Sequence, residues 1–256
     1  MGTTLHGQDG AVGTLSVAGI EVLPQLVARW RGWLMPERQP FVMPADAAAA
    51  RGWSDERAAL TFELADTFEL YGVSREDAVV LLDRTQARTL SDTVRRARVH
   101  RWPTRDAAAD IARTIRYIER GRVPSRHSEV VAWRLPGASR LAGTFPAGSG
   151  PNCFGTVMGA AGVAGAAAEW MEQEPFDAWL AASSRPGGRD DQSGTVLVWR
   201  AGDGAPAHAA VTLGDGWALN KASQGWMSPV QVLPVHEVIL RSRYRGLRLE
   251  RRRLAG

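Results

Sequence analysis

The chain of 256 residues contains one cysteine, Cys153, which directly follows the loop-like segment Gly-Ser-Gly-Pro-Asn. A single cysteine excludes an intrachain disulfide and any metal site built from several cysteines. The apolar stretch 154–168 predicts a helix that begins at Cys153. The positive end of a helix dipole favours the thiolate, which is the form that attacks a carbonyl carbon. The position indicates a nucleophile, and the alternative is a small buried apolar residue, the common role of a free cysteine.

A nucleophilic thiol needs a base that accepts its proton and a polar group that orients that base. Of the five histidines, His208 is the one that begins a strand-like run, 208–213, and Asn220 follows it twelve positions later on the next run. The remaining histidines show no such partner pattern. We therefore expect His208 to act as the base and Asn220 to orient it.

Whether Asn220 reaches His208 depends on the turn between their strands. A three-residue turn with Gly216 in the left-handed region makes Leu213 face Trp217, and this register places His208 and Asn220 diagonally on one face. A two-residue turn would point Asn220 away from His208. The sequence therefore makes a specific prediction about this hairpin.

Four segments resemble, in their order and spacing, the NlpC-like family of papain-fold cysteine peptidases. They are residues 148–155, 194–199, 208–220 and 222–225. The resemblance covers roughly residues 127–250 and implies that Cys153 is the nucleophile, His208 the general base and then acid, and Asn220 the orienting group. It also implies an oxyanion site at the backbone N–H of Cys153.

The sequence departs from that family around the cysteine. Relatives that cut bacterial cell-wall peptides commonly have Asp-Cys-Ser-Gly, whereas this chain has Asn152-Cys153-Phe154-Gly155. We expect Asn152 and Phe154 to contact substrate. Trp217 and Trp226 flank Asn220 and are further candidates for the substrate pocket, with core packing as their alternative role.

Composition narrows the partners and the location. The net charge is +4, and the 31 basic residues include a single lysine and are spread along the chain, so nucleic-acid binding is not expected. No Lys or Arg precedes Arg29, so the start does not fit a secretory signal and predicts a cytoplasmic protein. The longest apolar stretch is too short to span a membrane. We expect no cofactor and no metal, because Asp190, Asp191, Asp203 and Asp215 lie in turns without paired-ligand spacing.

The organisation predicts an α+β fold, with a papain-like NlpC-type domain preceded by an all-helical region. Residues 1–19 are expected to be a flexible lead, 20–126 a helical domain and 127–256 the catalytic domain. The helical domain is expected to contain helices at 54–72, from Ser74 through Val79–Leu82, from Ser91, and from Thr104 to Gly121. In the catalytic domain a second helix is expected near 176–182, and strands at 195–199, 207–213, 217–222, 236–241 and 244–249.

Together these features predict a cysteine-nucleophile amide hydrolase or acyltransferase that forms an acyl-enzyme on Cys153. Its substrate would be a small peptide-like molecule or specialised metabolite, with an acyl acceptor if the reaction is a transfer. One alternative is a cell-wall peptide (murein) endopeptidase. A second is a catalytically inactive binding or interaction module.

Overall fold

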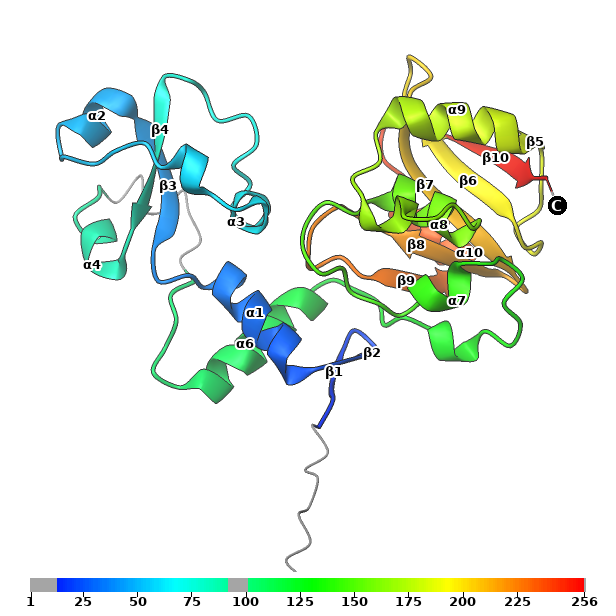
Figure 1. Ribbon diagram of the computed structural model, residues 1–256, viewed down its shortest axis with the longest axis horizontal. Coiled ribbons are helices and arrows are strands. Elements are labelled where there is room, and N and C mark those ends of the chain that lie inside the picture. Colours follow the sequence, from blue (N-terminus) through cyan, green and yellow to red (C-terminus); the bar gives the residue numbers. More distant parts are fainter. Residues whose placement is uncertain (1–12, 92–100, 256) are drawn as a thin grey trace, which may run out of the picture.

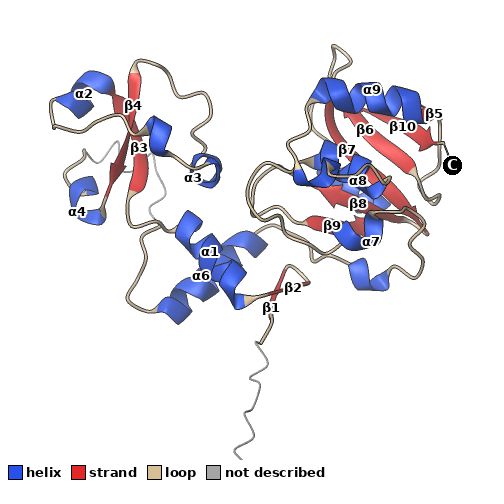
Figure 2. Ribbon diagram, in the orientation of Figure 1, coloured by secondary structure: helices blue, strands red, loops and turns tan. Residues whose placement is uncertain are grey.

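A computed structural model describes residues 13–91 and 101–255. Figure 1 shows two parts, an N-terminal part in blue to green and a C-terminal part, in green to red, built around a larger sheet. Both parts combine helices with antiparallel strands, so the α+β class is confirmed. Figure 2 shows that strands occur in the N-terminal part as well.

The C-terminal part contains a six-stranded antiparallel sheet. Its strands, in spatial order, are β5 (Ser184–Pro186), β10 (Arg248–Leu254), β6 (Thr195–Arg200), β7 (Pro206–Gly214), β8 (Trp217–Lys221) and β9 (Val230–Pro234). The central strands β6 and β7 are buried along most of their length, which agrees with their β-branched and small apolar residues.

Helices cover both faces of this sheet. One face packs against α8 (Cys153–Ala160), α9 (Gln173–Ser183) and the short helices α7 (Ala138–Leu141) and η3 (Ala166–Ala168). The other face packs against α10 (Val235–Arg241). Because strand side chains alternate between faces, neighbouring residues of one strand belong to different cores.

The N-terminal part holds two small sheets and several helices. Strands β1 (Leu15–Val17) and β2 (Ile20–Val22) form a hairpin, and β3 (Gln39–Pro44) pairs with β4 (Asp77–Leu82). The helices are α1 (Pro24–Leu34), α2 (Ala45–Ala49), η1 (Arg57–Ala59), α3 (Phe62–Thr67), α4 (Arg84–Ala87) and α6 (Ala107–Glu119), followed by η2 (His127–Glu129). Helices α1 and α6 pack against each other below the β3–β4 pair (Figure 1).

The prediction of an all-helical region was therefore wrong. The segment predicted as a helix from Ser74 is strand β4, in which Val79 and Val80 pair with Val42 and Phe41. A short apolar run with β-branched residues can become a buried strand when another strand lies beside it, and periodicity alone does not decide this. Residues 15–17, assigned to a flexible lead, form β1 instead.

Other helix predictions held in part. Helix α6 confirms the run from Thr104 to Gly121, although its cap is Asp106, whose carboxylate accepts from the N–H groups of Ala108 and Ala109. The helix predicted over 54–72 shortens to η1 and α3. The helix from Ser91 falls mostly on 92–100, outside the described residues.

Two predictions near the C-terminus need correction. The strand predicted at 236–241 is α10, because Val235 and Val238 recur at helical spacing and are both buried, while β9 just before it was missed. The last strand begins at Arg248 rather than Tyr244.

The helix that starts at Cys153 is shorter than the predicted stretch 154–168. It spans eight residues, and Gly162, at φ +99°, follows its end.

The two parts contact each other beside the segment that precedes Cys153. Trp226 is fully buried against Trp30, and its indole N–H donates to Thr67 Oγ1 at 2.8 Å. Ser149 Oγ donates to Asp66 Oδ2 at 3.2 Å. Helix α3 of the N-terminal part therefore fixes the loop that leads into α8.

Candidate functional site

Cys153 is the first residue of α8, as the sequence predicts, and Asn152 caps the helix. The Asn152 side-chain oxygen accepts from Gly155 N–H at 3.1 Å, and its amide nitrogen donates to Met171 O at 2.7 Å. Both polar atoms of Asn152 are thus committed to the protein. The structure assigns Asn152 the role of a helix cap, and the prediction that it contacts substrate is not supported.

The Cys153 thiol lies against the sheet and is 9% exposed. Burial raises its pKa to about 11, and this outweighs the opposing effect of backbone N–H groups of Ala209, Phe154 and Cys153 itself that donate to the sulfur. The charge of Lys221 also lowers this pKa. The free thiol is therefore protonated near neutral pH, although donors are already aimed at a thiolate.

Lys221 is the chain's single lysine and is buried on the same face of the sheet as Cys153. Its ammonium group donates to Ser228 O at 2.5 Å. Burial lowers the pKa of Lys221 to about 7, the Cys153 charge raises it, and the Arg122 charge lowers it further. Near neutral pH a large fraction of this amine is unprotonated and able to accept a proton.

The sequence analysis assigned no role to Lys221, although the alternation of side chains along β8 indicates which face of the sheet Lys221 occupies. In the observed register Val211 lies opposite Leu219, so the same register places Ala209 opposite Lys221. Ala209 belongs to the core beneath α8. Residue 221 therefore faces α8, and residue 220 faces away from it.

The β7–β8 turn differs from the expected one but keeps the expected register. Asp215 and Gly216, at φ +54° and +80°, form a two-residue turn, and a bulge between Thr212 and Gly214 shifts the pairing by one residue. Gly216 is left-handed, as predicted. The bulge compensates for the shorter turn, which restores the register that puts residues 208 and 220 on one face.

His208 and Asn220 accordingly meet. The ring Nε2 of His208 lies 2.9 Å from Asn220 Oδ1, and because that oxygen only accepts, Nε2 carries the proton. Burial lowers the pKa of His208, while the bond to Asn220 raises it less. The imidazole is therefore neutral at pH 7, and the predicted pair is confirmed as a geometric unit.

This pair does not include Cys153, which corrects the predicted triad. His208 contacts the ring of Trp199 at 5.2 Å between centroids, and Trp199 belongs to the core on the α10 face. Ala209, the next residue of β7, belongs to the core on the α8 face together with Cys153. Alternation along β7 thus separates the thiol from His208 by the thickness of the sheet.

The three aromatic residues predicted to contact substrate are packing residues. Phe154 is buried and stacks on Phe176 at 4.4 Å between centroids. Trp226 is buried between the two parts of the chain. Trp217, half-buried against the α8-side core, lies at the opposite end of β8 from Lys221. The alternative role in core packing fits all three side chains.

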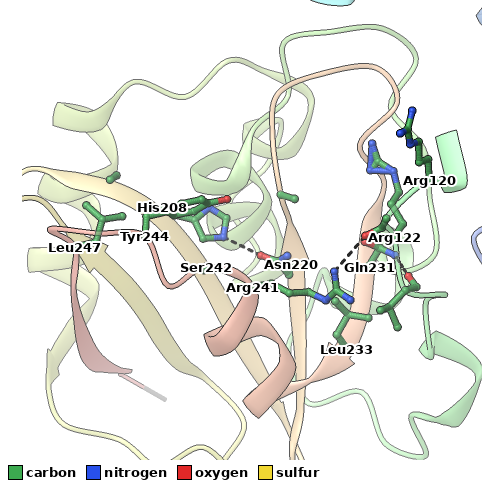
Figure 3. A pocket seen from close by; sticks show the side chains of 14 residues that line it. Arg120, Arg122, His208, Asn220, Gln231, Leu233, Arg241, Ser242, Tyr244 and Leu247 are labelled. Carbon is green, nitrogen blue, oxygen red and sulfur yellow. Dashed lines mark hydrogen bonds between the residues drawn. The ribbon is translucent and has the colours of Figure 1, made fainter. Parts of the chain in front are cut away.

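Two cavities lie at the end of the sheet where Lys221 and His208 are found. A cavity of about 350 Å³ on the α8 side contacts Lys221, and the segment 144–151 forms much of its wall. A cavity of about 450 Å³ on the α10 side contains His208 and Asn220 (Figure 3). His208 and Asn220 therefore line a different cavity from Lys221, and Cys153 is not among the lining residues of either cavity.

Comparisons with models of protein families, with curated proteins and with solved structures found no match for this chain. Within the residues that the structure describes, no group of three or more His, Cys, Asp or Glu side chains could hold a metal ion. None of the described helices is long and apolar enough to cross a membrane.

Proposed function

We propose that the chain is a cysteine-dependent amide hydrolase or acyltransferase in which Cys153 is the nucleophile and Lys221 is the proton acceptor. The observation that carries this proposal is the placement, on one face of the sheet, of a thiol at a helix start and a buried amine that acts on it electrostatically and whose pKa is lowered to about 7. Amines serve as the base for nucleophilic hydroxyl groups in serine–lysine enzymes, and the same logic applies to a thiol.

Acyl transfer at this pair requires no other protein base. The Lys221 amine takes the thiol proton as sulfur attacks the carbonyl carbon. The backbone N–H groups of Cys153 and Phe154, which donate to the sulfur in the free protein, are the donors available to the oxyanion at the start of α8. The C–N bond then breaks, and the Lys221 ammonium returns the proton to the leaving amine, which leaves a thioester on Cys153. Water, or an acceptor amine or alcohol, next attacks the thioester while Lys221 accepts its proton, and the thiol is regenerated by that proton.

The cavity that Lys221 lines favours a small substrate, although Cys153 itself is not among its lining residues. Its volume of about 350 Å³ lies at the lower end of the range for ligand sites. Apolar side chains such as Leu141 and Phe145 line it together with Lys221. An acyl group of modest size with apolar character fits this lining better than a charged peptide chain does.

A catalytically inactive binding module is the second candidate, and the burial of Cys153 favours it. A thiol that is 9% exposed with a pKa of about 11 resembles a core residue more than an activated nucleophile. The two candidates differ in whether Cys153 can be acylated.

Acylation is tested by intact-mass measurement after incubation with an activated ester such as p-nitrophenyl acetate. The enzyme proposal expects one acetyl group on the wild type, none on Cys153→Ala, and at least ten-fold slower acylation of Lys221→Met. His208→Ala is the matched control and should acylate at the wild-type rate, because His208 lies on the other face of the sheet. A wild-type thiol that stays unmodified supports the binding module, and loss of acylation in His208→Ala with retention in Lys221→Met would reject Lys221 as the base.

A further inference from the structure

The cavity on the α10 side is assembled from segments that are distant in the sequence. Residues 120–123, after α6, form one wall, and the β7, β8 and β9 strands supply His208, Asn220, Gln231 and Leu233. The end of α10 and the chain that follows it, 241–247, complete the cavity (Figure 3). Its volume of about 450 Å³ is sufficient for a small metabolite.

The charge of this cavity is one-sided. Three arginines line it, Arg120, Arg122 and Arg241, and no Asp or Glu is among the described residues of its wall. Arg241 approaches Glu237 of its own helix at 3.6 Å, and its guanidinium also donates to Gly121 O, so it reaches the segment that carries the other two arginines.

Arg122 has the strongest need for a counter-charge. Its side chain is partly buried, and its Nε donates to Ile118 O at 2.6 Å. Within the described part of the chain, no carboxylate forms an ion pair with Arg122, and burial lowers its pKa. A partly desolvated guanidinium without an anion carries an electrostatic cost that a bound anion would remove.

Neutral polar groups surround these cations. The Asn220 oxygen is held by His208, so the Asn220 amide nitrogen remains available as a donor on the cavity wall. Gln231 is fixed because its amide nitrogen donates to Val123 O at 2.6 Å. Ser242 and Tyr244, which carry hydroxyl groups, also line the cavity. These groups suit a polar ligand body, since each can donate or accept without a net charge.

We propose that this cavity is a binding site for a small polar anion, with its carboxylate or phosphate group at Arg122 and Arg241 and its neutral part against Asn220, Ser242 and Tyr244. The site is separate from Cys153, which lies on the other face of the sheet, although the Arg122 charge also acts on Lys221. A bare cation or an apolar molecule does not fit, because three arginines line the wall and no described carboxylate does. Guanidinium groups bind carboxylate and phosphate in the same forked geometry, so both anion types belong to the proposal.

Binding can be measured on the full chain by titration with inorganic phosphate and, separately, with acetate, at constant ionic strength. We expect saturable binding of at least one of them, reported by the His208 imidazole resonance and by calorimetry. Arg122→Gln and Arg241→Gln should each weaken it about ten-fold or more, since a hydrogen bond to a charged group contributes about 1.5–3 kcal/mol. Preference for phosphate or for acetate then identifies the anionic group.

Two further variants separate a specific site from general attraction of anions. Arg243→Gln removes the same charge two residues beyond Arg241, outside the cavity wall, and should leave the affinity unchanged. Arg122→Lys keeps the charge but loses the fork, and intermediate affinity is expected. Equal weakening in Arg243→Gln and Arg122→Gln, or no saturable binding of either anion to the folded wild type, overturns the proposal. Both variants keep Cys153 and Lys221, and binding is read from His208 and by calorimetry, so the outcome of this test is distinct from that of the acylation test.

Discussion

Lys221 and Cys153 face the same side of the sheet, and each shifts the pKa of the other toward its charged form. Burial acts in the opposite direction on both groups and dominates, so near pH 7 the thiol is protonated and the amine, with a pKa of about 7, is divided between its neutral and charged forms. The ion pair is then a minor state, formed when the proton moves from sulfur to nitrogen. Because titration of one group depends on the other, removal of either side chain should be visible in the behaviour of its partner.

The buried amine predicts an unusual dependence of stability on pH. The folded-state pKa of Lys221, about 7, lies below its ordinary value of 10.5, so between these two values the unfolded chain binds more protons than the folded chain. Lys221 therefore makes the free energy of unfolding rise by about 1.4 kcal/mol per pH unit across this window. As pH falls toward 7 the free energy of unfolding decreases at the same rate, because the unfolded chain binds a proton that the buried amine does not. Urea denaturation at about pH 7.5 and about pH 8.5 measures it. Lys221→Met should remove this slope, whereas Arg243→Gln should keep it, and an unchanged slope in Lys221→Met contradicts a buried neutral lysine.

The thiol predicts slow and strongly pH-dependent alkylation. With a pKa of about 11, compared with an ordinary value of 9.0, Cys153 should react with iodoacetamide more slowly than a small-molecule thiol near pH 8, and its rate should still be rising above pH 9. Lys221→Met removes the amine whose protonated form stabilises the thiolate, and should lower the rate further. The rate profile is measured by intact mass, with Cys153→Ala as the blank. A rate that levels off below pH 9 would show that burial does not control this thiol.

Strand parity explains what the sequence could predict about the site and what it could not. The start of α8 at Cys153 and the His208–Asn220 pair follow from local patterns, because a helix cap and a period-two strand are short-range features. Which face of the sheet α8 covers is decided by packing between distant segments, and α10 occupies the other face. Local sequence therefore predicted the helix start and the His208–Asn220 pair but could not tell that Lys221, rather than His208, faces the thiol.

The N-terminal part shows the same limit. The period of Ile111, Ile115 and Ile118 was sufficient to predict α6, whose amphipathic face is long enough to be distinctive. The run 77–82 is six residues long and is buried along most of its length, so helix and strand could not be distinguished without its partner β3. Pairing with β3, which lies almost forty positions earlier in the sequence, determines that this run forms a strand rather than a helix.

The two-residue turn of the β7–β8 hairpin predicts a backbone effect that can be isolated. Gly216 has φ +80°, and a methyl group built on it would meet nothing within 4 Å, so Gly216→Ala should lower stability through backbone strain alone, by about 1–2 kcal/mol. Gly202 is equally unobstructed but does not have a positive φ. Gly202→Ala is the matched control and should be neutral or slightly stabilising in urea denaturation. Equal effects at both positions would mean that Gly216 is not left-handed.

The hydrogen bond between His208 and Asn220 predicts how the imidazole responds to a charge in place of the amide. Asn220→Asp puts a carboxylate 2.9 Å from Nε2, and an adjacent negative charge favours the imidazolium, so the pKa of His208 should rise by at least one unit from its lowered wild-type value. Asn220→Leu removes the acceptor and should lower it further. A titration of the His208 resonance by NMR measures both shifts. The same variants test the separation of the two faces: because Cys153 lies beyond the sheet, its alkylation profile should be the same in Asn220→Asp as in the wild type. A changed thiol profile would mean that His208, Asn220 and Cys153 act together, and would restore the triad that the observed packing excludes.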